Sequence, residues 1–163
     1  SGVSNEEIKT GMASFRGVDR RFDFKIKTDK VVYLSDYAHH PEEIKQSILS
    51  MRALYGDKKL TGIFQPHLYT RTRDFYLEFA ESLSLLDEVI LTDIYPAREL
   101  PIEGVSSQLI YDNLRPDIDK ILCTKEEVID ILKKKEIEVL MTLGAGDIEN
   151  YAPQICEILN ERC

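Results

Sequence analysis

The sequence lacks the features of a membrane protein or a nucleic-acid-binding protein. None of its apolar runs reaches the ~18 residues that a membrane-spanning helix needs. It also lacks an excess of positive charge, since 21 Lys and Arg residues stand against 29 Asp and Glu residues, for a formal net charge of −8. A nucleic acid or an anionic membrane would require a basic patch, so neither is an expected partner. No signal peptide is visible, and we expect a cytoplasmic protein.

Cysteine and several catalytic motifs are scarce or missing. The three cysteines, Cys123, Cys156 and Cys163, are odd in number and show no CxxC spacing. We therefore expect reduced thiols rather than disulfides. The sequence has no GxSxG, no HExxH and no GxxxxGK[ST] phosphate-binding loop. These absences exclude the nucleophile elbow of serine hydrolases, the zinc-protease helix and a P-loop ATP site within the chain.

What is present indicates one globular domain, residues 1–163. The hydrophobic fraction of 43% and the charged fraction of 31% are ordinary for such a domain. Ser4 and Glu7 have the spacing of a capping box, which predicts a short first helix. Alternating apolar and polar residues over 22–26 and an apolar run over 31–35 predict two strands, joined by a hairpin turn at Thr28-Asp29.

Beyond this hairpin, helical and strand patterns alternate along the chain. We expect helices over 41–55, 75–86, 106–114, 125–135 and 147–161, and strands over 60–65, 88–93, 120–123 and 138–144. Such alternation is typical of an α/β protein with helices on both faces of a sheet. It predicts a Rossmann-like, doubly wound, mostly parallel sheet of about six strands, with an N-terminal antiparallel hairpin strand.

Unusual residues follow the carboxyl ends of four expected strands, where ligands bind in open parallel sheets. They are, in chain order, Asp36, Tyr37, His39 and His40, then His67, Tyr69, Arg71 and Arg73, then Asp93, Tyr95 and Arg98, and finally Gly144, Ala145, Gly146 and Asp147. All three histidines of the chain therefore fall at one rim. The arginines and a helix N-terminus favour phosphate or carboxylate, and the histidines could move protons, bind a metal or contact a ligand.

Each of these features also has a plainer interpretation. The histidine pair could merely cap the helix that begins at Pro41. Arg71 and Arg73 could form a solvated face, and the glycines of 144–146 could make only a tight turn. Their convergence at one rim favours a site, as does the long irregular segment 94–105, because loops of this length are often functional.

Four stretches carry a resemblance to a known family. In order, "DYAHHPEE", "FQPHLYTRTRDF", "DIYPARELPIEGV" and "TLGAGDI" closely resemble the C-terminal domain of the Mur ligases, and the likeness covers nearly the whole chain. "DYAHHP" suits several of these ligases, whereas "QPHLYTRTRD" with "YPARELPIEGV" is similar to the members that add L-alanine to UDP-N-acetylmuramate in peptidoglycan synthesis. The resemblance implies an ATP-dependent ligase. In it, Mg²⁺ and ATP phosphorylate the muramyl carboxylate, and the amine of L-alanine attacks the acyl phosphate.

The resemblance also implies that this chain is one of three domains. The domains that bind UDP-N-acetylmuramate and carry the ATP P-loop are expected elsewhere, so the chain alone is expected to be inactive and to hold neither ATP nor Mg²⁺ by itself. Arg21 resembles the family arginine that reaches the ATP phosphates from the domain junction. Asp36 resembles the acidic residue on the ATP side of the cleft. Arg16 and Arg20, beside Gly17, could meet phosphates only if another domain brings them.

The L-alanine pocket carried over from the family consists of six residues, with no metal ligand among them. They are Tyr37, His39, His67, Arg71, Gly144 and Ala145, with Arg71 as the carboxylate anchor and His39 as the catalytic group. Another nearby group could take the proton of the amine instead. His40 is expected mainly to fix the turn before Pro41.

Two positions depart from the family pattern, and two other functions compete. Ser35 stands where the family often has Asp, and Leu68 where it often has Arg, so His67 or Arg73 could replace a missing second guanidinium. A metal-dependent hydrolase could use the histidines with Asp36 and Asp93, although no HxH or HxxxH pair is present. A non-catalytic binding module is the other alternative, and a domain without a P-loop partly fits it.

Overall fold

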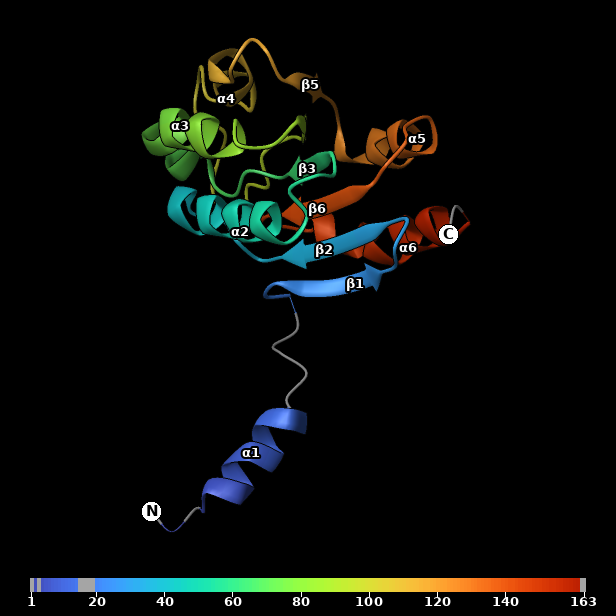
Figure 1. Ribbon diagram of the computed structural model, residues 1–163. Helices are drawn as coiled ribbons and strands as arrows, with labels where there is room; N and C mark the ends of the chain where they lie inside the picture. Colours follow the sequence, from blue (N-terminus) through green and yellow to red (C-terminus); the bar gives the residue numbers. More distant parts are fainter. Residues whose placement is uncertain (1, 3, 15–19, 162–163) are drawn as a thin grey trace.

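A six-stranded sheet forms the centre of the computed structural model, which describes residue 2, residues 4–14 and residues 20–161 (Figure 1). The strand order is β1-β2-β6-β3-β4-β5. β1 runs antiparallel to β2, and all other neighbours are parallel. The predicted fold class is confirmed. Arg16, Gly17 and Cys163 lie outside the described residues. The strands are β1 (Asp23–Lys27), β2 (Val32–Asp36), β3 (Leu60–Phe64), β4 (Glu88–Leu91), β5 (Asp119–Leu122) and β6 (Val139–Leu143).

Helices cover both faces of this sheet (Figure 1). On one face α2 (Pro41–Leu54), α3 (Tyr69–Leu83) and α4 (Gln108–Asn113) pack against the strands, and on the other face α5 (Val128–Lys133) and α6 (Ala152–Asn160) do so. Ile44, Ile48 and Met51 of α2 are fully buried. Their three- and four-residue spacing is the apolar stripe that the sequence predicts.

Side-chain caps begin two of the expected helices. Ser4 Oγ donates to Glu7 Oε2 at 2.8 Å and accepts the Glu7 backbone N–H at 3.3 Å, which confirms the capping box ahead of α1 (Asn5–Ser14). Thr124 and Glu127 form a second box, but the segment opens with the 3₁₀ turn η1 (Lys125–Glu127) before α5.

Two helix boundaries differ from the expectation. α3 begins at Tyr69, six residues before the apolar pattern indicates, and Phe75 interrupts it with φ −129° and ψ 17°. The segment expected as one helix from 147 starts instead with the 3₁₀ turn η2 (Ile148–Tyr151), and α6 follows at Ala152. Pro153 explains this second difference, because a residue without an N–H suits the first turn of a helix and not its interior.

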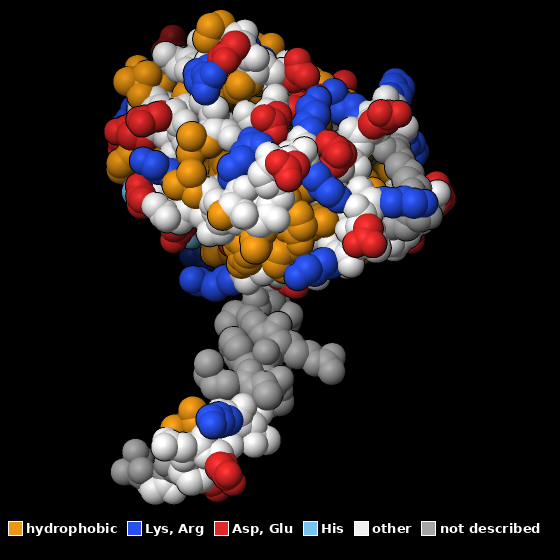
Figure 2. Space-filling view, in the orientation of Figure 1, with side chains coloured by type: hydrophobic (Ala, Val, Ile, Leu, Met, Phe, Trp, Pro, Cys, Tyr) orange, Lys and Arg blue, Asp and Glu red, His pale blue; other side chains and the backbone are white. Residues whose placement is uncertain are grey.

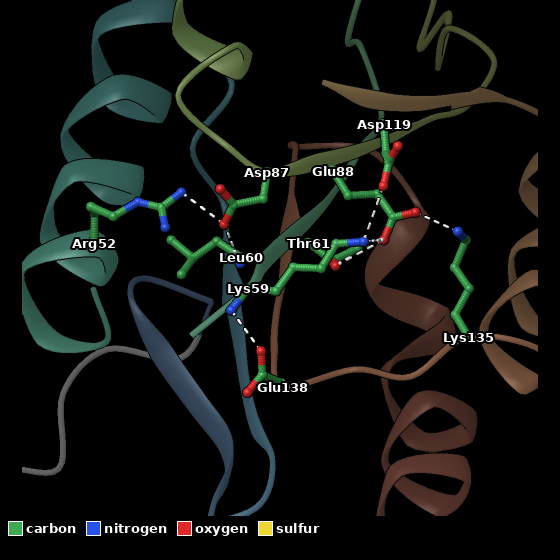
Figure 3. Close-up of polar contacts among 9 residues, drawn as sticks. All are labelled: Arg52, Lys59, Leu60, Thr61, Asp87, Glu88, Asp119, Lys135 and Glu138. Atoms are coloured by element: carbon green, nitrogen blue, oxygen red, sulfur yellow. Dashed lines mark hydrogen bonds and ion pairs between the residues drawn. The ribbon is translucent and has the colours of Figure 1, made fainter. Parts of the chain in front are cut away.

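A buried carboxylate, Glu88, links neighbouring strands at their amino ends, opposite the predicted ligand rim (Figure 3). It opens β4 and is 2% exposed. Thr61 Oγ1 donates to it at 3.1 Å, Lys59 Nζ lies 3.3 Å away, and Lys135 forms a further ion pair. Burial opposes the charge of Lys59, but its contacts with Asp119 and Glu88 leave its pKa raised. Glu88 therefore joins β3 and β4 to the segment that precedes β6.

Two more carboxylates fix backbone N–H groups beside Glu88 (Figure 3). Glu138 Oε2 accepts the Lys59 N–H at 2.8 Å, and Asp87 Oδ2 accepts the Leu60 N–H at 2.8 Å. Asp87 also lies 3.0 Å from Arg52 Nη2 of α2. The start of β3 is thus held to its neighbours by charged groups that no short motif indicates.

We expect Glu88→Gln to lower the free energy of unfolding by about 1–3 kcal/mol, because Lys59 and Lys135 lose a buried counter-charge while the side-chain volume is kept. Urea denaturation of the chain measures the change. Glu81→Gln, on the exposed side of α3, is the matched control and should change stability by less than about 0.5 kcal/mol. Equal effects of the two substitutions would contradict a stabilising role for Glu88.

Candidate functional site

The carboxyl ends of four neighbouring strands, β2, β6, β3 and β4, lie level with one another. Leu143 of β6 pairs with Asp36 of β2 on one side and with Phe64 of β3 on the other, and Phe64 pairs with Leu91 of β4. The segments that leave these strands therefore begin side by side. This register produces the predicted convergence of the unusual residues.

A row of four rings crosses the rim. The Tyr37 and His39 centroids are 5.2 Å apart, those of His39 and His67 are 6.1 Å apart, and His67 stacks on Tyr95 at 5.6 Å with an interplanar angle of 20°. The rings come from the segments after β2, β3 and β4. His39 and His67 thus belong to one site, and Tyr95 joins them as a residue to which sequence reasoning assigned no role.

The turn between β2 and α2 is held by Glu43. Its Oε2 atom accepts the backbone N–H of His39 at 3.1 Å and of His40 at 3.2 Å. Burial opposes ionisation of Glu43, but these two hydrogen bonds and the nearby imidazoles leave its pKa lowered. His40 is the N-cap with extended φ −113° and ψ 145°, as a residue before proline prefers. The exposed His40 side chain lies with its ring 5.0 Å from that of Phe75.

Arg71, on the first turn of α3, pairs with His67, which lies two residues before that helix. Arg71 Nη1 donates to His67 Nδ1 at 3.3 Å. Burial lowers the pKa of His67, and the charges of Arg71 and His39 lower it further. Arg73 instead lies on the exposed side of α3 and binds Asp74, with Nε 2.7 Å from Oδ1. Leu68 stands where the family often has Arg, and His67 and Arg73 were the two expected substitutes. Only His67 contacts Arg71.

Leu68 turns the chain from β3 into α3 through an unfavourable conformation. Its φ of 73° and ψ of 135° lie where residues other than glycine are strained. Its N–H donates to the Tyr95 carbonyl at 2.9 Å, and its carbonyl accepts both the N–H and the Oγ1 hydroxyl of Thr72. These bonds hold the turn and align His67 with Tyr95, whose backbones form a parallel bridge.

The long segment 94–105 caps α3 with Glu99. The Glu99 carboxylate accepts the Thr70 N–H at 3.0 Å and the Thr70 hydroxyl at 2.5 Å. The hydroxyl and then the N–H hydrogen bond lower the pKa of Glu99. The segment therefore supports the Arg71 turn as well as supplying Tyr95.

Gln65, directly after β3, makes the main contacts with the loop of residues 144–147. Its side chain donates to Asp147 Oδ1 at 2.7 Å and accepts the Ile148 N–H at 2.9 Å. A Cβ on Gly144, whose φ is 136°, would lie 2.6 Å from the Gln65 carbonyl oxygen, and one on Gly146 would lie 2.2 Å from Gln65 Oε1. The two glycines thus permit close packing, and half-buried Ala145 stands between them.

A cavity of about 290 Å³ opens beside the end of β2. It is lined by Arg21, Phe22, Asp36, Tyr37, Ala38, Glu43, Gln46, Ser47 and Ser50. Asp36 accepts hydrogen bonds from the Ser47 hydroxyl at 2.6 Å and the Ala38 N–H at 3.3 Å. Arg21 and Asp36 therefore share one cavity, whose volume is at the small end of the range for a ligand site.

Arg20 links the start of the sheet to Tyr37. Its guanidinium carbon lies 4.8 Å from the Tyr37 ring centroid, and its side chain pairs with Glu149. The Tyr37 N–H also donates to the Arg20 carbonyl at 2.6 Å. Arg20 has a positive φ of 67° and Phe22 one of 48°. Two strained residues thus flank Arg21, a feature with no signal in the sequence.

The described parts of the chain contain no cluster of three or more His, Cys, Asp or Glu side chains arranged to hold a metal ion. The geometry consequently offers no ligand set there for the metal-hydrolase alternative. None of the described helices has the length and apolarity that a membrane crossing requires.

The fold and this rim define the class of protein. Residues 20–148 match the family described as Mur ligase, glutamate ligase domain. The chain therefore belongs to the Mur ligase family and corresponds to its C-terminal domain.

Particular relatives are ligases for one amino acid. The chain is 78% identical over 162 residues to the UDP-N-acetylmuramate–L-alanine ligase of Phocaeicola vulgatus, covering 99% of this chain and 35% of that protein. It is 50% identical to the ligase of that name from Porphyromonas gingivalis, over all of this chain and 36% of that protein. The chain thus spans about a third of the length of these relatives.

Two solved structures share the fold of the chain. The crystal structure of the UDP-N-acetylmuramate–alanine ligase from Thermotoga maritima superposes with a TM-score of 0.79 at 25% identity, over 99% of this chain and 35% of that one. A murein peptide ligase from Psychrobacter arcticus shares the fold, with a TM-score of 0.70 at 17% identity, over 97% of this chain and 33% of that one.

Gly144→Ala should destabilise the chain by more than about 2 kcal/mol, because it combines a strained φ with a clash against the Gln65 carbonyl. Gly104 is the matched control. It also has a positive φ, of 75°, but a Cβ there would meet nothing within 4 Å. Gly104→Ala should therefore cost only about 1 kcal/mol. Denaturant titration of both variants measures the difference, and an equal loss would show that Gln65 does not restrict the loop.

Proposed function

We propose that the chain is the C-terminal domain of an ATP-dependent ligase that joins L-alanine to UDP-N-acetylmuramate in peptidoglycan synthesis. In this proposal the domain receives L-alanine at the rim and completes an ATP site, and it works in the cytoplasm. The observation that carries the proposal is the placement of the Arg71–His67 pair beside His39 and Tyr37. A guanidinium there can bind the carboxylate of a small amino acid, and the rings can enclose its methyl group.

The specificity for a small amino acid rests on packing in this proposal. Tyr37 is held by the Arg20 guanidinium on its ring and by the backbone bond of its N–H. A ring fixed in this way forms a wall that larger side chains would meet. A missing methyl group changes binding by only ~1–3 kcal/mol, so glycine would be disfavoured more weakly than bulky amino acids.

The ATP contribution of this domain rests on Arg21 and Asp36. Asp36 keeps lone pairs for a hydroxyl group of a nucleotide, and the exposed Arg21 guanidinium suits phosphate. The cavity they share holds only part of a nucleotide, so the remaining contacts and Mg²⁺ belong to a domain outside this chain. ATP and Mg²⁺ would supply activation of the muramyl carboxylate, and the residues described here would orient the amino acid that attacks it.

In the full-length ligase, Arg71→Ala should raise the KM for L-alanine about ten- to a hundredfold and affect the KM for ATP much less. The reason is the loss of a charge-assisted hydrogen bond to a partly buried carboxylate. Kinetics with the two substrates varied separately test this. Arg73→Ala removes the same charge two residues away and should leave both constants within about twofold. An equal loss for both substrates in Arg71→Ala would point to a structural role.

The adjacent residues His39 and His40 should have different functions. His39→Ala in the full-length ligase should lower kcat while the melting temperature stays nearly unchanged, because the His39 backbone bond to Glu43 remains. His40→Ala should keep turnover but lower stability by about 1 kcal/mol, through loss of the ring contact with Phe75. Thermal melts and alanine kinetics decide the matter, and a stable His40→Ala enzyme without turnover would reverse the assignment.

A further inference from the structure

The Tyr37 carbonyl fixes where His39 carries its hydrogen. His39 Nδ1 lies 2.9 Å from this oxygen. A carbonyl oxygen can only accept a hydrogen bond, so Nδ1 must donate. In the neutral ring, Nε2 therefore holds the lone pair. Among the residues that the structure describes, no side chain or backbone group donates a hydrogen bond to that atom, which leaves it able to accept a proton.

Glu43 adds a negative charge on the same side of the His39 ring. Its Oε2 atom lies 3.6 Å from His39 Nδ1. That oxygen also accepts the two backbone N–H groups of the turn, which fixes its place. With its pKa lowered, Glu43 is ionised at neutral pH. This places a negative charge beside the Nδ1 edge of the ring.

His67 has the opposite arrangement. Arg71 can only donate, so His67 Nδ1 accepts and its lone pair is occupied. Burial and the neighbouring positive charges lower the pKa of His67, and the hydrogen bond that Nδ1 accepts places the hydrogen of the neutral ring on Nε2. The two rings lie 6.1 Å apart, and only His39 offers a free lone pair.

We infer that Glu43 is a positioning residue which, together with the Tyr37 carbonyl, holds His39 in its Nδ1–H form so that His39 Nε2 takes a proton from the ammonium group of the incoming amino acid. The inference rests on the proposed function. His67, in its Nε2–H form, supplies a hydrogen-bond donor to the same ligand. The geometry thus gives the two rings different roles, because His39 accepts the proton and His67 donates a hydrogen bond.

The proton balance of this step is simple. One proton passes from the ammonium to His39 Nε2 and leaves a neutral amine with its lone pair. That pair forms the C–N bond at the activated carboxyl carbon, while the C–O bond to phosphate breaks and its electrons leave with the phosphate. The second amine proton goes to the phosphate, and His39 later releases its proton to water.

Several charged groups surround His39. Glu43 approaches from α2, Arg71 from the first turn of α3 and His67 from the segment just before it. Arg20 lies over the neighbouring Tyr37 ring. Glu99, from the segment 94–105, acts on His67. Glu43 is the only carboxylate within 4 Å of His39 Nδ1 among the described residues. Removing the negative charge of Glu43 should therefore leave mainly positive groups around His39. The protonated form of the His39 ring should then be less stable.

Nitrogen-15 NMR of the chain itself tests the arrangement without any ligand. Three histidines give a spectrum simple enough to assign by substitution, and exposed His40 serves as the reference for a mixture of tautomers. The expected result is a Nδ1–H tautomer for His39 and a Nε2–H tautomer for His67 in one sample above the titration range. A Nε2–H tautomer for His39 would overturn the inference.

Kinetics of the full-length ligase test the role of Glu43. Glu43→Gln keeps an acceptor for the turn but loses the charge. It should lower kcat about two- to fivefold, move the acidic limb of the kcat/KM profile to lower pH, and leave the KM for L-alanine within twofold. Glu42→Gln, one residue away and bonded to Gln46, loses the same charge and should change none of these.

The outcomes separate this inference from the proposed function. An unchanged pH profile and kcat in Glu43→Gln would overturn the role of Glu43, even if Arg71→Ala still raises the KM for L-alanine. If Arg71→Ala leaves that KM unchanged while the two histidines show the expected tautomers, the proposed alanine site fails and the hydrogen-bond arrangement stands.

Discussion

The rim depends on the contact between Gln65 and the loop that follows β6. The side chain of Gln65 is almost fully buried and bonds both to the Asp147 carboxylate and to a backbone N–H of η2. A buried amide left without partners would be costly, so the loop must approach closely, and only glycine at 144 and 146 permits this approach. Gln65 lies two residues before His67. The same contact therefore closes the floor of the site and sets the point from which the His67 turn starts.

The amino ends and the carboxyl ends of the strands are stabilised by different kinds of contact. At the amino ends of the strands, buried Glu88 and its lysine partners bind strands to one another through charged side chains (Figure 3). At the carboxyl ends, carboxylates such as Glu43 and Glu99 bind backbone N–H groups of the turns. Arg71 pairs instead with the His67 ring. Figure 2 shows charged side chains of both signs interspersed over the face that it presents, with apolar areas between them.

Much of the candidate site follows from sequence once the strand ends are known. Parallel register brings Asp36, Leu143 and Phe64 level, so residues just after them had to converge. The role of Glu43 could have been found from its place three residues after His40, because a Glu at this spacing completes a capping box. No comparable signal indicates the contacts of Gln65, and the sequence places Tyr95 at the rim and Arg20 near the start of the sheet without indicating what they contact. Their contacts join positions between 17 and 129 residues apart, and a local pattern carries no information about partners at that distance.

The sequence by itself determined the order of strands and helices, the antiparallel start of the sheet, the buried stripe of α2 and the family of the chain. These features depend on short-range periodicity, on caps and on contiguous motifs, which a linear pattern contains. Only the tertiary structure decided which nitrogen of His39 carries the hydrogen, why Arg71 and not Arg73 faces the imidazoles, and how Leu68 and Arg20 are held in strained conformations. Each of these depends on a hydrogen bond or ring contact whose geometry exists only after the segments have packed, because the energy that fixes it comes from a partner elsewhere in the fold.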